Sequence, residues 1–350
     1  MSAVIVTKLL IRSVQIYFPP IGHIHGWISH NRGGCELLGT RGLNVLNSDL
    51  GKDLFLRFRV TGVWSELTFE ASPTLECARS YAPTGSRKPF CFADPALRTI
   101  SRLANESYHD FLIEEMLDIP ELLKYMGNLS TYCDATERRR HAERVLFKAV
   151  TIEKNLDDWL SSFRLTHPYP YTWSLSTGHD GPGRSRHSAY FPQCLQFVDL
   201  MAAQAMVHYW AAMVIVLRCI MICQDILASN PLVSQRYDPS EYIDGMEDGV
   251  LGEVLTRSGL RDMALRFADC ICCSAEYCAS KDKGAPGPII LLFPLWVAKD
   301  LYADEGKLYQ GKKSFCLEVF EGITKRGIHF SKALMDLSIM DLRYDQGQKV

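Results

Sequence analysis

Cysteines are the residues of this sequence whose spacing comes nearest to a metal site. Cys270 and Cys273 form a C-x-x-C pair, Cys278 follows five residues later, and Cys219 and Cys223 lie in an apolar stretch upstream. A structural zinc site needs four ligands, commonly from two such pairs, and the sequence has no second C-x-x-C or H-x-x-x-H pair. We therefore expect these cysteines to be buried core residues, and we assign no metal-ligating residue.

The redox state of the 12 cysteines depends on whether the chain is secreted. The first 20 residues are apolar, but Lys8 and Arg12 interrupt them before a secretory core of adequate length forms. We interpret this segment as an amphipathic helix rather than a signal sequence. The cysteines are then expected to be thiols in a reducing compartment.

Adjacent carboxylates at Asp157 and Asp158 could bind a divalent cation, as in helical enzymes that ionise diphosphates. Neighbouring side chains on a helix point about 100° apart, so this pair would need a second acidic cluster opposite it. The run DGMED at 244–248 is the candidate for that cluster. The alternative, which we favour, is a solvated helix face.

Polar side chains also gather in the irregular segment 166–186, where they could bind an anion or a metal. They are His167, His179, Asp180, Arg184, Arg186 and His187 just beyond it. Flexible polar loops collect such residues without a function, and no phosphate loop, G-x-S-x-G elbow or H-E-x-x-H motif accompanies them. We therefore assign no catalytic and no cofactor-binding residue, and we expect that the protein is not an enzyme.

A basic run at 138–141, Arg-Arg-Arg-His, could be a nuclear import signal or a phosphate contact. Because Glu137 and Glu143 flank the run, we expect an exposed helix start that carries ion pairs. Over the whole chain, 38 basic residues face 40 acidic ones, for a net charge of -2. This balance predicts no general attraction to nucleic acid or to a membrane.

The elements that would position all these residues are organised around the stretch 191–227, which is apolar on nearly every side of a helical wheel. A membrane span is the alternative, but Asp199, Gln204, His208 and Arg218 interrupt the stretch too often. We predict one long buried helix here, in an all-α fold built around it.

Helical periodicity or apolar composition predicts further helices, and proline or glycine marks their ends. They span 4–16, 49–69, 97–117, 134–163, 240–255, 260–280, 289–302, 313–325 and 328–342. Pro294 is expected in the first turn of its helix. The glycines of segment 26–42 leave that segment without a helix prediction, and no strand is predicted anywhere. Irregular segments near 72–95 and 166–190 and a polar tail at 344–350 complete a single helical domain, 1–350.

Three segments together resemble the regulatory region of fungal zinc-cluster transcription factors. The first comprises Trp27, His30, Gly33, Leu37, Leu38, Arg41 and Gly42, followed by 48–55; the second is Tyr209-Trp210; the third comprises 271–277, Gly284, Gly287 and 292–298. The resemblance implies an all-helical domain in the nucleus that regulates transcription. It also implies contacts with other transcription factors or coregulators, and a possible homo- or heterodimer.

One departure from that family affects the expected contact with DNA. The family binds DNA through a compact array of six cysteines that holds two zinc ions, and this chain has no such array. DNA is therefore expected to be reached indirectly, through a partner, and no cofactor is expected. Our hypothesis is a transcription-regulatory protein, and the resemblance implies control of a biosynthetic gene cluster as one such role. The alternative is a helical enzyme or small-molecule-binding module with a pocket between helices.

Overall fold

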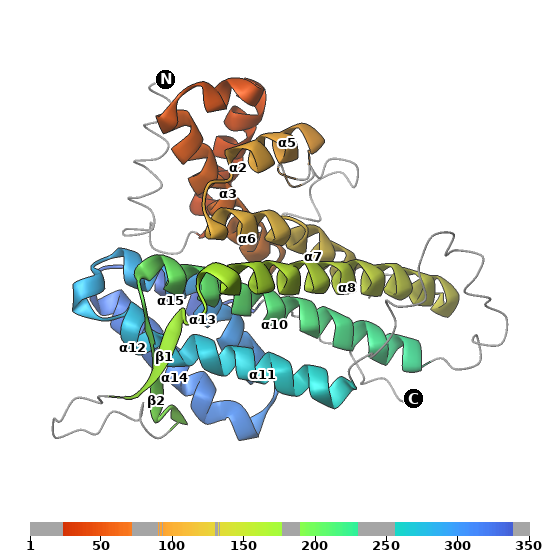
Figure 1. Ribbon diagram of the computed structural model, residues 1–350. Coiled ribbons are helices and arrows are strands. Elements are labelled where there is room, and N and C mark those ends of the chain that lie inside the picture. The colour runs from red at the N-terminus through yellow and green to blue at the C-terminus, as the bar shows by residue number, and fades with distance from the viewer. Residues whose placement is uncertain are drawn as a thin grey trace.

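The computed structural model describes residues 24–71, 94–129, 134–176, 190–229 and 256–338, with the single residues 90, 92 and 132. Nearly all of these residues are helical, so the predicted all-α class is confirmed. Figure 1 shows the N-terminal helices stacked on one side of a layer of long helices. The predicted helices at 4–16 and 240–255 and the tail at 344–350 lie outside the described residues, as does most of the segment 72–95.

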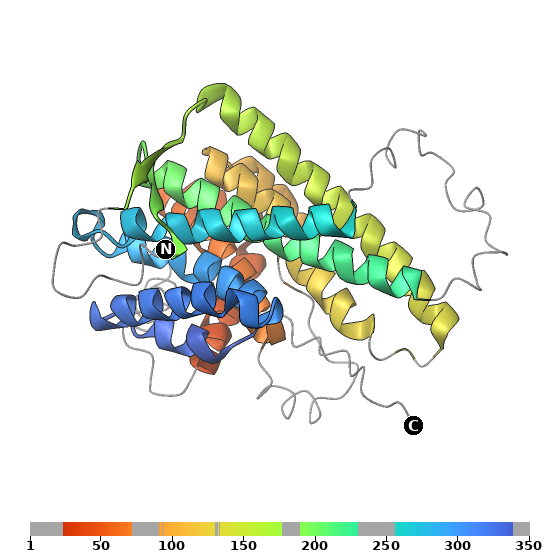
Figure 2. The same cartoon turned by 90° about the horizontal axis from the view of Figure 1, so that it is seen from below.

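The long central helix, α10, spans Leu200–Ala228 and packs against three other helices of the core. These are α8 (Ala135–Thr166), α11 (Arg257–Cys273) and α13 (Pro286–Asp304). Every residue from 205 to 221 is buried, which confirms the predicted central helix. By length and composition α10 could cross a membrane, but a core helix passes the same test, and here α10 is enclosed by protein. Figure 2 shows it between α8 and α11.

The predicted start of the central helix at residue 191 is wrong. Asp199 is the N-cap, and its carboxylate accepts a hydrogen bond from the amide of Ala202 at 2.7 Å. Such a cap satisfies an amide that has no partner within the helix. Upstream of the cap the chain is extended, so the apolar run of the sequence is divided between two kinds of structure.

A two-stranded sheet forms where no strand was predicted. Strand β1 (Tyr171–Leu175) pairs antiparallel with β2 (Gln193–Phe197), with Trp173 opposite Leu195. The irregular segment 166–190 therefore contains a strand. Strand β2 packs on α10, α11 and the short helix α12 (Ala275–Cys278), and this packing stabilises two strands of five residues each.

Among the residues described before α8, the chain forms six helical elements. They are α2 (Ile24–Arg41), η1 (Gly42–Asn47), α3 (Asp49–Ala71), α5 (Pro95–Ala104), α6 (Tyr108–Met116) and α7 (Ile119–Asn128). The single helix predicted for 97–117 is wrong, because Ser107 and Asp110 form a capping box that starts a new helix after Asn105. The glycine-rich segment without a prediction is helix α2, in which Gly34 lies against the ring of Phe58 on α3.

The C-terminal part adds η6 (Lys281–Lys283), η7 (Lys307–Tyr309), α14 (Gln310–Lys325) and α15 (Phe330–Asp336). The helix predicted for 260–280 is divided at Ser274, between α11 and α12. The placement of Pro294 in a first turn is also wrong: α13 begins at Pro286, so Pro294 lies in its interior. Its missing amide hydrogen leaves the carbonyl of Ile290 without a helical donor. The side chain of His208 on α10 hydrogen-bonds to the backbone of Ile290 instead.

Gly287, at the start of α13, is a position where a side chain would disturb packing. A Cβ atom there would lie 2.2 Å from the carbonyl oxygen of Cys278. We expect Gly287→Ala to lower the free energy of unfolding by about 1–3 kcal/mol, because backbone must shift to admit the methyl group. Urea denaturation of the variant and the wild type measures this.

Gly322, inside α14, provides the matched control. A Cβ atom there would meet no atom within 4 Å. Gly322→Ala should raise the free energy of unfolding by up to about 1 kcal/mol, because alanine favours a helix over glycine. Equal effects of the two substitutions would contradict the close approach at Gly287.

Candidate functional site

The cysteines lie in the core, as predicted. Nine cysteines fall among the described residues, all as free thiols, and of these only Cys270 is not fully buried. Burial raises the pKa of Cys270 to about 11 and that of Cys273 to about 12, so both thiols are protonated at neutral pH. Among the described residues no three His, Cys, Asp or Glu side chains are placed to hold a metal ion.

Asp157 and Asp158 point to different surroundings on α8. Asp157 accepts a hydrogen bond from the Tyr209 hydroxyl at 2.8 Å, which joins α8 to α10, and Asp158 is exposed. Tyr209 is buried beside that carboxylate, and both effects raise its pKa. The acidic run 244–248 lies outside the described residues. The structure thus assigns Asp157 a role in packing.

The basic run at 138–141 carries ion pairs and backbone contacts, as expected of a helix start. Arg139 pairs with Glu143 at 3.0 Å, and Arg138 donates to the carbonyl oxygen of Tyr132. His141 is buried rather than exposed. Of the loop side chains, His167 stacks on Phe163 with ring centroids 4.6 Å apart. The other five, from 179 to 187, lie outside the described residues.

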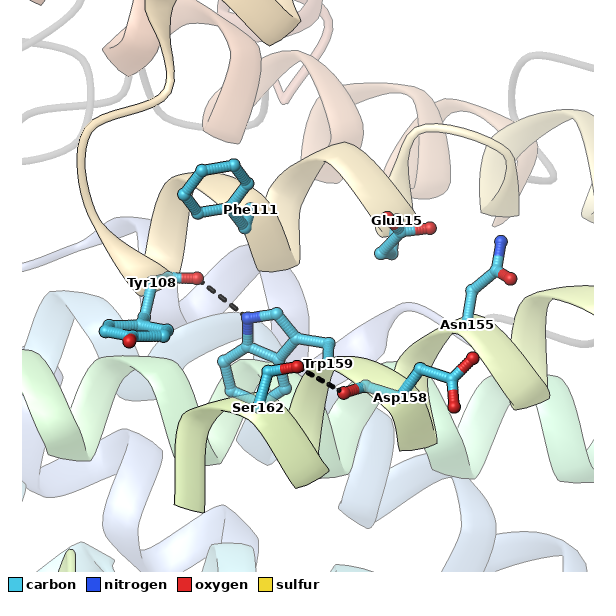
Figure 3. A pocket seen from close by; sticks show the side chains of 7 residues that line it. All are labelled: Tyr108, Phe111, Glu115, Asn155, Asp158, Trp159 and Ser162. Carbon is cyan, nitrogen blue, oxygen red and sulfur yellow. Dashed lines mark hydrogen bonds between the residues drawn. The ribbon is translucent and has the colours of Figure 1, made fainter. Parts of the chain in front are cut away.

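A groove of about 470 Å³ lies between α6 and α8. Its lining residues are Tyr108, Phe111, Glu115, Asn155, Asp158, Trp159 and Ser162. Figure 3 shows Trp159 at its centre and Glu115 facing Asn155 at one end. The indole N–H of Trp159 donates to the carbonyl oxygen of Tyr108 at 2.8 Å, which fixes the floor of the groove.

The groove combines aromatic rings with carboxylates. Burial and the nearby Glu114 carboxylate raise the pKa of Glu115, although its hydrogen bond with Asn155 acts in the opposite direction. Phe111 is half exposed at the rim, and the Ser162 hydroxyl donates to the carbonyl oxygen of Asp158. No cysteine or histidine lines the groove. Its chemistry suits the binding of a cation with an apolar body.

A second candidate site is an apolar surface at the sheet, which we call the hairpin surface. It consists of the exposed side chains of Leu165, Tyr169, Trp173, Leu175, Val198 and Met201. Leu175 is 76% exposed and Trp173 is 51% exposed. Segments 165–176 and 190–198 contain no Asp, Glu, Lys or Arg. Figure 1 shows the sheet at one end of the layer of long helices, in front of α12. The charged residues next to its members in the sequence are Arg164 and Asp199, both exposed. Exposed apolar surface of this kind marks an interaction site.

Several charged side chains that sequence reasoning missed lie in the core. Arg59 on α3 is fully buried. It donates to Ser101 Oγ and Asn105 Oδ1, both at 2.6 Å, and lies 3.2 Å from Asp110. Its partners are 42 to 51 residues away in the sequence, so helical spacing could not reveal them. These groups join α3, α5 and α6, and they have a structural role.

Lys299 is a second buried cation with a structural role. Its ammonium group donates to the carbonyl oxygens of Leu334, Met335 and Leu337, at 3.1, 2.9 and 2.6 Å. These carbonyls lie at the C-terminal end of α15, where a helix has acceptors without intrahelical donors. Lys299 therefore anchors α15 to α13.

Comparisons with protein-family models, with curated proteins and with solved structures find no match to this chain. The described residues define an all-helical protein with a small sheet, a cation-compatible groove and an apolar hairpin surface. Its membership of a particular family stays a prediction from the sequence.

Proposed function

We propose that this chain is a transcription-regulatory protein that acts through contacts with other proteins. The observation that carries the proposal is the hairpin surface, which exposes large apolar side chains over a completed core. The link to transcription comes from the resemblance to the regulatory region of fungal zinc-cluster factors. DNA would be reached through a partner, and the nucleus is the expected location.

The positions of the resembling segments add support of a structural kind. Trp27 of the first segment stacks on Phe293 of the third, with ring centroids 5.7 Å apart and planes at 28°. Trp64, on the helix that begins within the first segment, also stacks on Phe293, with ring centroids 5.1 Å apart and planes at 8°. Residues far apart in the sequence thus build one aromatic core, as expected if the resemblance reflects a shared fold.

A reporter assay tests the regulatory role. The full chain is fused to a DNA-binding domain of known target, and transcription from a promoter with that target is measured. We expect a several-fold change in transcription relative to the DNA-binding domain alone, and a loss of the change when Leu175 is replaced by aspartate. An unchanged reporter would overturn the proposal. Tight, sequence-selective DNA binding by the purified chain would contradict the need for a partner.

The groove supports a second candidate function, the binding of a small cation with an aromatic body. Glu115 is the observation that favours it, because this carboxylate lies partly buried beside Trp159 without a cationic side chain lining the groove. Titration with phenethylamine, followed by tryptophan fluorescence, is the direct probe.

We expect Glu115→Gln to weaken phenethylamine binding about tenfold, because the ammonium group loses a carboxylate partner in a partly dry site. Glu321→Gln, on the exposed face of α14, is the matched control and should leave binding unchanged. Equal affinities of the wild type and Glu115→Gln would remove the groove as a cation site.

A further inference from the structure

The outer edge of β1 is a free strand edge. On its inner side β1 pairs with β2, and among the described residues no third strand joins the sheet. The amide of Ser176 donates to the carbonyl oxygen of Pro192, and the amide of Val198 donates to that of Pro170. Even-numbered residues of β1 therefore bond to β2. In an antiparallel ladder the alternate residues direct their N–H and C=O groups to the other side.

The outward-facing backbone groups belong to Tyr171, Trp173 and Leu175. None of the three is a proline, so each offers one donor and one acceptor. The prolines of this region are at the even positions 168 and 170. Residues at even positions direct their backbone groups toward β2, so these prolines remove no donor from the outer edge. The edge is thus able to pair along the whole length of the strand.

The edge is complementary to itself. If a second β1 strand pairs antiparallel about a two-fold axis at Trp173, Trp173 faces its own copy and Tyr171 faces Leu175 of the other copy. The outward-facing N–H and C=O groups of these three residues then lie opposite the same groups of the other strand, so they can pair without a shift of register. The facing side chains are aromatic or aliphatic, which are the cross-strand pairs that stabilise sheets.

Charge favours a second copy over an unrelated partner. A two-fold interface places each charged side chain near its own copy, and like charges there are destabilising. Segments 165–176 and 190–198 carry no Asp, Glu, Lys or Arg, although 22% of the chain consists of these residues. The nearest charges are at the ends of these segments: Arg164, Asp199, and Glu276, which accepts a hydrogen bond from Ser176. Exposed strand edges that remain unpaired usually carry lysine or another charge to prevent association. Strand β1 carries none.

We infer that two copies of this chain associate through the outer edges of their β1 strands, forming a four-stranded sheet with a two-fold axis at Trp173. The neighbouring side chains of the hairpin surface surround this axis. The inference deepens the proposed function, because it names a second copy as an occupant of the hairpin surface.

Replacing Trp173 with residues of opposite charge tests the position of the two-fold axis. Trp173→Asp would place two carboxylates opposite each other, and Trp173→Lys would do the same with two ammonium groups. Sedimentation equilibrium should show a wild-type dimer, and each variant alone should have a dissociation constant raised about 100-fold. An equimolar mixture of the two variants should form a dimer again, because Asp then faces Lys across the axis.

Phe147→Asp is the matched control. It removes an exposed aromatic side chain from α8, outside the hairpin surface, and should leave the dimer intact. Because Trp173 is half exposed, thermal unfolding of the Trp173 variants should match the wild type, which separates loss of association from loss of fold.

Three outcomes would overturn the inference: a monomeric wild type at all concentrations, a dimer that Trp173→Asp leaves intact, or a mixture of variants that stays monomeric. The proposed function is judged separately by the reporter assay. A monomer that still changes reporter transcription would refute the dimer alone and leave the hairpin surface to another protein.

Discussion

Replacing Asp300 with alanine should lower the free energy of unfolding by about 3–5 kcal/mol, because it leaves a buried arginine without its main partner. Arg218 lies inside the core on α10, and its Nη1 donates to Asp300 Oδ2 at 3.0 Å. Burial alone would lower the pKa of Arg218, but Asp300 and Asp304 more than offset that effect and raise it. Ser338 donates to the second oxygen of Asp300 at 2.6 Å, so the carboxylate also holds the C-terminal end of the described chain.

Asp304 provides the control, since it pairs with the same guanidinium group. It lies one helical turn beyond Asp300 on α13 and contacts Nη2 of Arg218, but its side chain is 52% exposed. Asp304→Ala should therefore lower the free energy of unfolding by less than about 1 kcal/mol. Urea denaturation at pH 7 measures both variants.

A double substitution distinguishes an unpaired charge from a packing defect. In Arg218→Met with Asp300→Leu both charges are gone, and similar volumes fill the site. The double variant should be more stable than Asp300→Ala alone, because no charge is left buried. If the double variant is no more stable than the single one, the loss comes from packing, and the account of Asp300 given above is wrong.

The parts of the fold that the sequence could predict are those set by local pattern. The helix α8 follows from apolar residues spaced by three and four, and α10 follows from an apolar run long enough to require burial. The apolar run did not show where α10 begins, because Phe191, Leu195 and Phe197 extend it upstream of the helix. The capping side chain of Asp199 was visible in the sequence as a cap signal, and it would have given the correct start.

The parts that could not be predicted depend on contacts between distant residues. Arg59 is buried because polar groups of α5 and α6 surround it, and no local pattern reports that environment. Strand β1 exists because β2 and α12 lie beside it. Pro294 is tolerated inside α13 because a side chain of α10 reaches the carbonyl it leaves unpaired. Sequence reasoning treated His208 and Arg218 as interruptions of an apolar stretch, whereas both join helices in the core.

The hairpin surface was hidden from sequence reasoning for a related reason. The prolines and glycines of segment 166–190 indicate a loop. The signal that could have identified the surface is the absence of charge from 165–176 and 190–198, together with the aromatic and β-branched residues of 171–173. The groove gave no such signal, since its residues come from two helices and none of them forms a motif.

Lowering the pH from 7 to 5 should lower the free energy of unfolding through two buried histidines, and His109 alone should contribute about 2 kcal/mol to this loss. His109 on α6 and His208 on α10 form a hydrogen bond of 2.9 Å between Nε2 and Nδ1. Burial, reinforced by Arg59, lowers the pKa of His109 to about 3. Burial and the neighbouring His109 also lower the pKa of His208 well below its usual value, although the bond to Ile290 opposes this.

The sign of the effect follows from the direction of these pKa shifts. Above about pH 6.5 both histidines are neutral in the folded and the unfolded chain, so they contribute no pH dependence. Below that pH the unfolded chain takes up protons that the folded chain does not. The contribution of the two histidines to stability is therefore fully present above about pH 6.5, and it is lost progressively as the pH falls toward 3.

The hydrogen bonds of the pair explain why protonation is resisted. Since Nδ1 of His208 faces His109, its Nε2 is the atom left to reach the carbonyl oxygen of Ile290, where Pro294 supplies no donor. In this arrangement Nδ1 of His208 accepts from His109. A proton added to Nδ1 of His208 would break that bond and place a charge in the core, beside the ring of Trp64, whose centroid lies 5.4 Å from that of His208.

Urea denaturation at pH 7, 6 and 5 measures how the free energy of unfolding changes with pH, and the variant His109→Gln supplies the comparison. The variant loses one titrating group but keeps a side-chain amide that can donate to His208. It should be less stable than the wild type at pH 7 and should lose about 2 kcal/mol less on going to pH 5. If the wild type and the variant lose equal stability between pH 7 and 5, His109 is not a source of the acid sensitivity, and other groups must carry it.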